Sequence, residues 1–271
     1  MIEINKNYNE SNLETMAKMP DCFVDLTVTS PPYDGLRTYN GYCFDFENVA
    51  KELFRVTKQG GVVVWIVGDA TIKGCETLTS FKQALYFKEV GFNVDTNIYQ
   101  KQNYKPVNAK RYDNVFEYIF VLSKGQPKTF NPIMVEKARV KSESGKYRQK
   151  DGSMKTSIRK PNELKKATNI FSYSIGGHIA DKIAFEHPAI FPEQLVNDQI
   201  MSWSNENNLV YDPFMGSGTV AKISILNTRN WIGSEISSEY CEIIEERVKK
   251  AWEEKRKEKD LTQKTLFENE M

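Results

Sequence analysis

The chain has 271 residues, enough for one large α/β domain with an insertion, and a formal net charge of +1, which excludes a protein that is basic overall. The four cysteines are scattered without a Cys-x-x-Cys pair, which argues against a zinc site or a disulfide framework and favours a reducing cytoplasm. The polar start has no signal-peptide features and no apolar run approaches the ~20 residues of a membrane span, so we expect a cytoplasmic protein without membrane association.

Predicted strands and helices alternate along most of the chain. Apolar runs predict strands at 2–5, 23–28, 62–67, 94–99, 116–122, 209–211 and 231–233. Helical spacing predicts a helix at 12–18 with Asn12 as its cap, and a second helix from Phe46 that ends at the glycine pair 60–61. A third helix includes Phe81 and Leu85 and ends at Gly91. Further helices are predicted from Val196 to Trp203, after Thr219, and from Tyr240 to Trp252. The run at 62–67 is apolar throughout, as in a parallel strand covered by helices on both faces. The pattern therefore predicts a doubly wound α/β fold.

The strand at 23–28 runs into Thr29-Ser30-Pro31-Pro32-Tyr33. Two prolines end the strand and lack an N–H, so the loop offers hydrogen-bond acceptors rather than donors. Rigid acceptors beside an aromatic ring suit a planar ring that carries an amino group. A strand end with a plain turn explains the same residues, so this motif alone leaves both interpretations open.

Basic residues far outnumber acidic ones between Ser123 and Lys166, and the apolar periodicity is lost there. The segment is either a solvated, disordered loop or a basic insertion that tracks a phosphate backbone. The second interpretation makes the following residues candidates for DNA contacts, together with Arg37 in the loop at 34–43: Lys141, Arg148, Lys150 and Arg159. The all-round charged stretch at 257–271 is expected to be a frayed tail.

A second motif, DPFMGSGT at 212–219, lies between a strand and a helix. Glycines let a ligand approach the backbone, and the helix N-terminus supplies N–H groups. No lysine follows as in a Walker A loop, and the third glycine of a dinucleotide fingerprint is missing. Glu235, at the tip of the next strand, suits the two hydroxyls of a ribose, and Asp212 suits a cationic group. The pattern favours S-adenosylmethionine as the cofactor; a glycine turn that serves packing alone is the alternative.

TSPPY at 29–33, DPFMGSGT at 212–219 and HPAIFP at 187–192 together resemble the amino-methyltransferases of DNA, which methylate exocyclic nitrogens of cytosine or adenine. The catalytic motif precedes the cofactor motif, an order similar to the circularly permuted beta group. The resemblance implies a Rossmann-like, mainly parallel seven-stranded sheet. It also implies these parts: a catalytic half at 1–122, a target-recognition insertion at 123–170, a cofactor-binding half at 171–256 and the tail at 257–271.

The family pattern implies roles for individual residues. Ser30 Oγ and the Pro31 carbonyl would accept the N–H groups of a flipped base, Tyr33 would stack on it, and Pro32 would hold the loop. The residues that match the cofactor-binding part are Asp212, Phe214, Gly216, Ser217, Gly218, Thr219 and Glu235, with Pro188 and Phe191 beside them. The usual Gly-Asp before the first helix is replaced by Glu10-Ser11, so Asn9 or Glu10 is expected to substitute for the aspartate.

Serine in the Ser-Pro-Pro-Tyr motif favours N4 of cytosine in duplex DNA, and N6 of adenine is the alternative. Methylation at C5 is rejected because no cysteine follows a proline. We expect a site-specific enzyme of a restriction-modification system, with any nuclease encoded elsewhere and a monomeric or homodimeric state. A catalytically silent DNA-binding relative and a methyltransferase for RNA or a small molecule remain as other classes.

Overall fold

A computed structural model describes most of the chain. The described residues are 2–32, 44–104, 106–107, 110–137, 143–159, 163–174 and 191–269. They form two compact units: the first combines Met1–Asn131 with Asn169–Met271, and the second is Pro132–Thr168. No helix among the described residues is long and apolar enough to cross a membrane.

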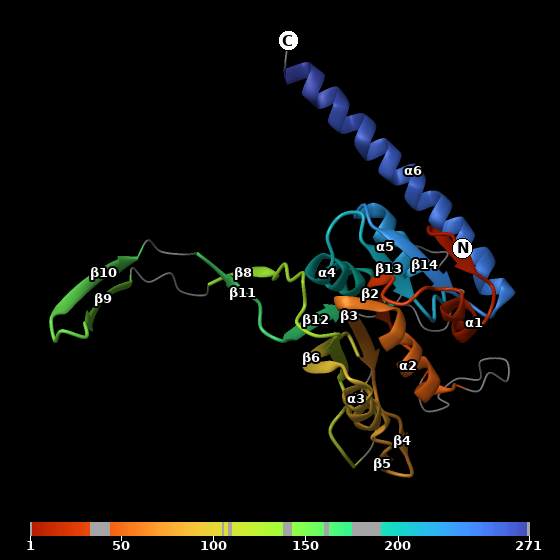
Figure 1. Cartoon of the computed structure of the whole chain (residues 1–271), viewed down its shortest axis with the longest axis horizontal. Helices are drawn as coiled ribbons and strands as arrows, with labels where there is room; N and C mark the ends of the chain where they lie inside the picture. The colour runs from red at the N-terminus through yellow and green to blue at the C-terminus, as the bar shows by residue number, and fades with distance from the viewer. Residues whose placement is uncertain are drawn as a thin grey trace. The chain divides into compact units, whose positions relative to one another are not determined.

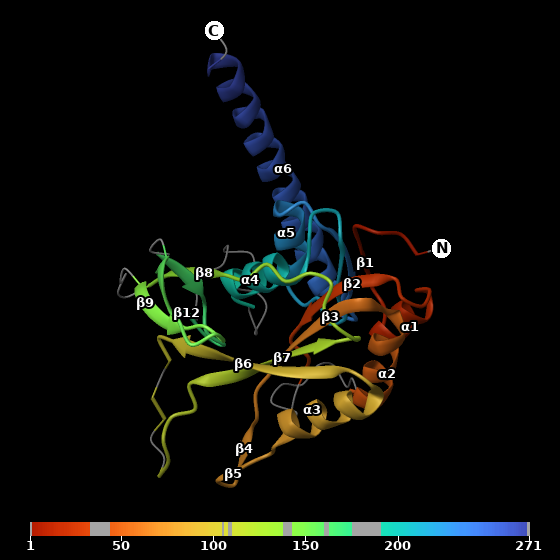
Figure 2. The same cartoon turned by 60° about the vertical axis from the view of Figure 1, so that its left-hand side comes forward.

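One large sheet forms the centre of the first unit (Figure 1). Its strands are β1 (Lys6–Tyr8), β2 (Val24–Thr29), β3 (Thr57–Val67), β6 (Asn93–Gln102), β7 (Phe116–Ser123), β12 (Ile170–Ser174), β13 (Leu209–Asp212) and β14 (Asn230–Ser234). Their order is β1-β14-β13-β2-β3-β7-β6-β12. Every neighbouring pair is parallel except the two that include β7, which runs beside β6 in Figure 2. The mainly parallel sheet is confirmed; it has eight strands rather than seven because β12 adds to β6 at one edge.

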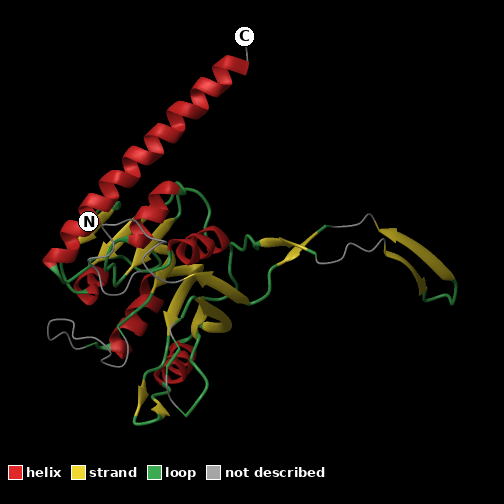
Figure 3. Ribbon diagram, turned by 180° about the vertical axis from the view of Figure 1, so that it is seen from behind, coloured by secondary structure: helices red, strands yellow, loops and turns green. Residues whose placement is uncertain are grey.

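Helices cover both faces of the sheet (Figure 3). The helices are α1 (Asn12–Ala17), α2 (Phe46–Val56), α3 (Thr79–Val90), α4 (Glu193–Trp203), α5 (Thr219–Leu226) and α6 (Ser238–Asn269). Along β3, Val64 and Ile66 join the core shared with α4, α5 and α6, whereas Val63 and Trp65 join the core shared with α1, α2 and α3. The predicted burial of this strand on both faces is confirmed.

The chain order changes direction between β13 and β2, which are neighbours in the sheet. From β13 the chain passes through α5 on one face to β14, and from β2 it passes through α2 on the other face to β3. At such a point the two connections separate and leave a crevice at the carboxyl ends of the strands, where ligands of open α/β sheets bind.

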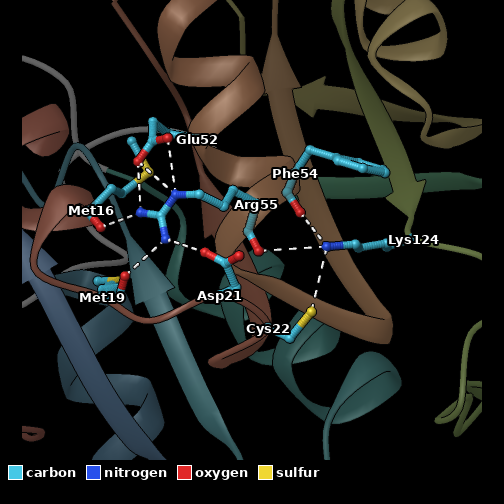
Figure 4. A network of polar contacts seen from close by, with 8 residues as sticks. All are labelled: Met16, Met19, Asp21, Cys22, Glu52, Phe54, Arg55 and Lys124. Atoms are coloured by element: carbon cyan, nitrogen blue, oxygen red, sulfur yellow. Dashed lines mark hydrogen bonds and ion pairs between the residues drawn. The ribbon is translucent and has the colours of Figure 1, made fainter.

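Arg55 joins α2 to the end of α1 (Figure 4). Its guanidinium donates to the carbonyls of Met16 (2.6 Å) and Met19 (2.9 Å), at a helix C-terminus where a cation is favoured. The carboxylates of Glu52 and Asp21 complete the network at 2.7 and 2.8 Å. The hydrogen bonds to these carboxylates raise the pKa of Arg55, so the guanidinium stays charged.

Lys124 closes the end of α2 in the same view (Figure 4). Its Nζ donates to the Phe54 carbonyl at 2.7 Å, lies 4.6 Å from the centre of the Phe54 ring, and contacts Cys22 Sγ at 3.6 Å. Lys124 immediately follows β7, so these contacts hold the end of α2 against the end of that strand.

The N-terminal elements differ from the prediction in their bounds. The first strand is Lys6–Tyr8 rather than 2–5, because residues 6–8 are the ones that pair with β14. The cap of α1 is Ser11 rather than Asn12: Ser11 Oγ accepts from the N–H of Glu14, whose carboxylate accepts from the N–H of Ser11.

The glycine pair at 60–61 lies inside β3 and does not end α2, which ends at Val56. At Gly61 a Cβ would lie 2.9 Å from the carbonyl of Asp25 on β2, and the β2–β3 register shifts at this point. The glycines therefore allow a close approach of two strands in an irregular register.

Two helices bury less apolar surface than expected. In α3, Phe81 and Leu85 are exposed, and the buried face consists of Ser80, Gln83 and Phe87. The side chain of Gln83 accepts a hydrogen bond from Trp65 at 2.9 Å.

Helix α6 continues to Asn269, so the predicted frayed tail is helical, and Trp252 is 38% exposed. Opposite charges four residues apart favour the helix there.

The second unit contains two antiparallel strand pairs, although the sequence showed no periodicity there. They are β8 (Met134–Glu136) with β11 (Leu164–Lys166), and β9 (Glu143–Arg148) with β10 (Met154–Arg159). The turn between β9 and β10 is closed by Asp151, whose carboxylate accepts from the N–H (2.9 Å) and the hydroxyl (2.7 Å) of Ser153. A short hairpin of the first unit joins β4 (Thr71–Ile72) to β5 (Cys75–Glu76).

Candidate functional site

The two sequence motifs meet at one edge of the sheet. Ser30 follows β2, Asp212 ends β13, and Glu235 follows β14. Because these three neighbouring strands are parallel, their carboxyl ends lie side by side at the crevice. In the loop that follows β2, Ser30 and Pro32 are partly exposed, whereas Pro31 is buried.

A buried hydrogen bond joins the two motifs. The Thr29 hydroxyl donates to Asp212 Oδ1 at 2.7 Å, and the N–H of Phe214 donates to the same oxygen at 3.0 Å. Asp212 is 2% exposed. Burial raises the pKa of its carboxyl to about 7; the charge of Glu235 adds to the rise, and the two hydrogen bonds oppose it. No ion pair among the described residues includes Asp212, so its carboxylate suits a cationic group of a ligand.

Backbone groups hold the Glu235 carboxylate. Its two oxygens accept from the N–H of Gly216 (2.8 Å) and of Ser237 (2.9 Å), and each keeps lone pairs for a further donor. Burial raises the pKa of Glu235, opposed by these backbone hydrogen bonds. A carboxylate fixed in this way can accept from a pair of hydroxyl groups, as a ribose requires.

The glycine loop that includes Gly216 and Gly218 connects β13 to α5. Both glycines have positive φ, +52° and +80°, which other residues rarely adopt. Helix α5 begins at Thr219, so its first N–H groups point out of the loop. The loop packs on α6, since a Cβ at Gly218 would lie 3.1 Å from Ile244 Cγ1. The carboxylates of Asp212 and Glu235 fit S-adenosylmethionine, which has a ribose and a cationic methionine end.

Aromatic side chains flank the loop on both faces of the sheet. The Phe214 ring packs edge-on against Phe44 at 5.4 Å and Trp65 at 6.3 Å between centroids. Phe191 packs against the core on the opposite face, with α4, α5 and α6. Phe44, which precedes α2, therefore lies beside Phe214 in the connection from β13 to α5.

The residues Glu10-Ser11, which stand where the family pattern has Gly-Asp, serve the structure of α1. The Glu10 carboxylate accepts from the Thr15 hydroxyl at 2.9 Å and pairs with Lys18, and Ser11 caps α1. Asn9 is the residue that reaches the site, where its Nδ2 donates to the Glu235 carbonyl at 2.9 Å.

Several expected residues cannot be placed. Tyr33, Arg37, Lys141 and Pro188 lie outside the described residues, and so does the side chain of Arg159. Arg148 and Lys150 are exposed beside the turn of the second unit. Their contacts with DNA stay a prediction.

Two residues of the site were missed in the sequence. Thr29 immediately precedes Ser30, but its partner is 183 residues away. Arg247, in α6, is 1% exposed and donates to Ser217 and Thr219 of the glycine loop. The signal for Arg247 was present: a lone arginine occupies the apolar face that Ile244 and Ala251 define.

A protein-family model described as DNA methylase, of the N6/N4 methyltransferases, matches residues 24–246. The orphan methyltransferase M.BamHII of Bacillus amyloliquefaciens is 56% identical over 239 residues, which cover 84% of this chain and 90% of that protein. The DNA adenine methyltransferase YhdJ of Escherichia coli is 25% identical over 248 residues, covering 85% of this chain and 78% of that protein.

Solved structures share the fold. The PvuII DNA methyltransferase, named as cytosine-N4-specific, has a TM-score of 0.66 and 20% identity, covering 92% of both chains. The protein TTHA0409 from Thermus thermophilus, solved in complex with S-adenosyl-L-methionine, has a TM-score of 0.59 and 20% identity, covering 91% of this chain and 95% of that one. With its matched motifs and this relationship, the chain belongs to the N6/N4 family of DNA methyltransferases, which use S-adenosylmethionine as the methyl donor.

Proposed function

We propose that the protein methylates the exocyclic N4 of a cytosine flipped out of duplex DNA, at a specific sequence. One observation carries this proposal: the Ser30 loop and the glycine loop leave adjacent parallel strands and are joined through Thr29 and Asp212. A base at the first loop and a cofactor at the second would therefore be neighbours in one crevice.

Residues on β13 and β14 would hold the cofactor. Glu235 would accept the ribose hydroxyls, Asp212 would face the cationic methionine end, and the loop from Gly216 to Thr219 would lie against the ligand. The aromatic rings of Phe214 and Phe191 would flank it, with Pro188 nearby. When bound, the cofactor supplies an electrophilic methyl group on a sulfonium.

The loop after β2 would hold the target base. An exocyclic amine is a poor nucleophile because its lone pair is delocalised into the ring. The Ser30 hydroxyl and the Pro31 carbonyl would accept its N–H groups and favour a pyramidal nitrogen, which stabilises the transition state rather than the ground state. Pro32 would keep the loop rigid, and Tyr33 would stack on the base.

The choice between cytosine and adenine rests on Ser30. A hydroxyl is a weaker acceptor than the carboxylate of an aspartate, and the family resemblance associates serine with N4 of cytosine. N6 of adenine is the second candidate, since the relatives include an enzyme named for adenine as well as a structure named for cytosine.

The basic segment 123–170 would recognise the target sequence. The exposed Arg148 and Lys150, together with Lys141, Arg159 and Arg37, would contact DNA phosphates or bases. The remaining boundaries follow from this assignment: a catalytic half at 1–122, a cofactor half at 171–256 and a charged end at 257–271. A restriction nuclease encoded elsewhere is the expected cellular counterpart of such a methyltransferase.

The test is incubation of unmethylated plasmid DNA with labelled S-adenosylmethionine, followed by mass spectrometry of the nucleosides. N4-methylcytosine is the expected product, and Ser30→Ala should reduce its rate by about a hundredfold. N6-methyladenine would replace the base assignment while keeping the fold and cofactor. No labelled base in the DNA, with a protein that binds the cofactor, would overturn the proposal.

A further inference from the structure

Arg247, Glu193 and Lys222 form an ion-pair network next to the glycine loop. Arg247 Nη2 donates to Glu193 Oε1 at 2.8 Å, and Lys222 Nζ donates to the same carboxylate at 2.8 and 3.1 Å. The Arg247 side chain is 0% exposed, and those of Glu193 and Lys222 are 21% and 15% exposed. The network joins the first residue of α4 to residues within α5 and α6.

The other terminal nitrogen of Arg247, Nη1, donates hydrogen bonds to the glycine loop. Nη1 donates to the Ser217 carbonyl at 2.5 Å, to Ser217 Oγ at 3.1 Å and to Thr219 Oγ1 at 3.1 Å. Ser217 and Thr219 are 4% and 2% exposed, so these oxygens face the interior. Arg247 thus satisfies the acceptors of the loop and leaves the first N–H groups of α5 for a ligand.

The loop is therefore held from two sides. The carboxylate of Glu235, which follows β14, accepts from the N–H of Gly216, and the guanidinium of Arg247, in α6, donates to Ser217 and Thr219. Gly218, between them, packs against Ile244, which lies one turn before Arg247 on α6. Glycine has no Cβ and adopts positive as readily as negative φ, so the shape of this segment depends on these contacts.

The position of Arg247 is a poor one for stability alone. A cation near the N-terminus of α5 opposes the helix dipole, and buried ion pairs can often be replaced by apolar side chains without loss of stability. A guanidinium gives what an apolar side chain cannot: donors fixed in one plane that reach a carbonyl, two hydroxyls and a carboxylate at once. The geometry favours a role in orienting the loop.

We infer that Arg247, oriented by Glu193, is a positioning residue for the cofactor: it presets the loop from Gly216 to Thr219 in the shape that binds S-adenosylmethionine. This inference rests on the proposed assignment of the loop to the cofactor. It predicts that loss of the guanidinium weakens cofactor binding more than it slows methyl transfer from the saturated enzyme.

The experiment compares Arg247→Met, which keeps length and apolar volume, with Arg247→Lys and with Arg256→Met, an arginine change on the exposed part of the same helix. Arg247→Met should raise the Kd and KM for S-adenosylmethionine by about tenfold and change kcat at saturation by less than about twofold. Arg247→Lys should restore part of the affinity because its ammonium keeps the charge, and Arg256→Met should match the wild type. Hydrogen exchange of the cofactor-free protein should be on the order of tenfold faster at 216–219 in Arg247→Met, with the β3 amides unchanged.

The variant Glu235→Ala distinguishes a failure of the positioning role of Arg247 from a failure of the proposed cofactor site. If Glu235→Ala abolishes cofactor binding while Arg247→Met binds as the wild type does, the positioning role is wrong and the proposed site stands. If Glu235→Ala binds normally, the site itself is wrong. If Arg247→Met lowers kcat with an unchanged KM, or if exchange becomes faster throughout the first unit, Arg247 has another role and the inference fails.

Discussion

The hydroxyl of Thr29 donates to the buried carboxylate of Asp212 across two adjacent parallel strands, at 2.7 Å. Thr29 ends β2 immediately before the loop proposed for the target base, and Asp212 ends β13 immediately before the loop proposed for the cofactor. Together with the pairing of β2 and β13, this hydrogen bond sets the relative position of the two loops from which methyl donor and acceptor would approach each other.

Thr29→Val should test this connection, because valine keeps the shape and removes the donor. The change should lower the free energy of unfolding by about 1–3 kcal/mol at a pH where Asp212 is ionised, since a buried carboxylate loses a partner. It should also raise the pKa of Asp212 further, because this hydrogen bond lowers it. Chemical denaturation measures the first effect.

Thr27→Val is the matched control on the same strand. Thr27 is 0% exposed, and in the described structure its hydroxyl has no hydrogen-bond partner. Its replacement should be neutral or stabilising. Equal losses in the two variants would mean that the Thr29–Asp212 bond contributes nothing specific.

Asp212 should make cofactor affinity depend on pH. Its folded pKa of about 7 means that the carboxylate is mostly protonated at pH 6 and mostly ionised at pH 8. A cationic ligand prefers the ionised form, so affinity for S-adenosylmethionine should rise about tenfold over this range. Titration calorimetry at both values measures it, and Asp212→Asn should bind weakly with little pH dependence. A flat profile in the wild type would contradict a direct role for this carboxylate.

The same group should affect stability in the opposite sense. Because the folded pKa of Asp212 lies above its ordinary value of 3.8, the folded state holds the proton more tightly than the unfolded chain. Its stabilising contribution is complete below pH 3.8 and is lost as the pH rises through about 7. Asp212→Asn should therefore show a smaller fall in Tm between about pH 5 and pH 8 than the wild type, whereas Asp260→Asn, at an exposed position, should show the same fall.

Glu235→Gln should weaken cofactor binding by roughly 10–100-fold, because hydrogen bonds to a charged acceptor contribute about 1.5–3 kcal/mol. Glutamine also presents a donor to the N–H of Gly216 or of Ser237, both of which need an acceptor. The measurement is the Kd for S-adenosylmethionine, with the exposed Glu239→Gln as control. Unchanged binding in Glu235→Gln would remove the ribose assignment.

Arg55→Met should affect stability rather than activity. It removes the guanidinium donor from the carbonyls of Met16 and Met19 and from the carboxylate of Glu52, and the expected loss is about 1–3 kcal/mol. Lys51→Met, at an exposed position on the same helix, should change stability by less than about 0.5 kcal/mol. Denaturation curves decide this, and a Tm of Arg55→Met equal to that of the wild type would show that the network is dispensable.

The sequence by itself determined most of the sheet and both loops, because each depends on nearby residues. The apolar run of β3, the prolines after Ser30 and the glycines before Thr219 act through local backbone geometry and burial. The error in α3 has a non-local cause: Phe81 and Leu85 fit a helical period, but the helix buries Gln83, which accepts a hydrogen bond from Trp65 on β3.

Only the tertiary structure decided how the loops are held. The donor to Asp212 is 183 residues away, the residue that meets the Glu235 carbonyl is Asn9, 226 residues away, and Arg247 reaches a loop some 30 residues earlier. Such contacts depend on strand order and register, which bring together side chains that no local pattern relates. The motifs in the sequence therefore determined which chemistry is possible, and the packing of β2, β13, β14 and α6 decided where its parts lie.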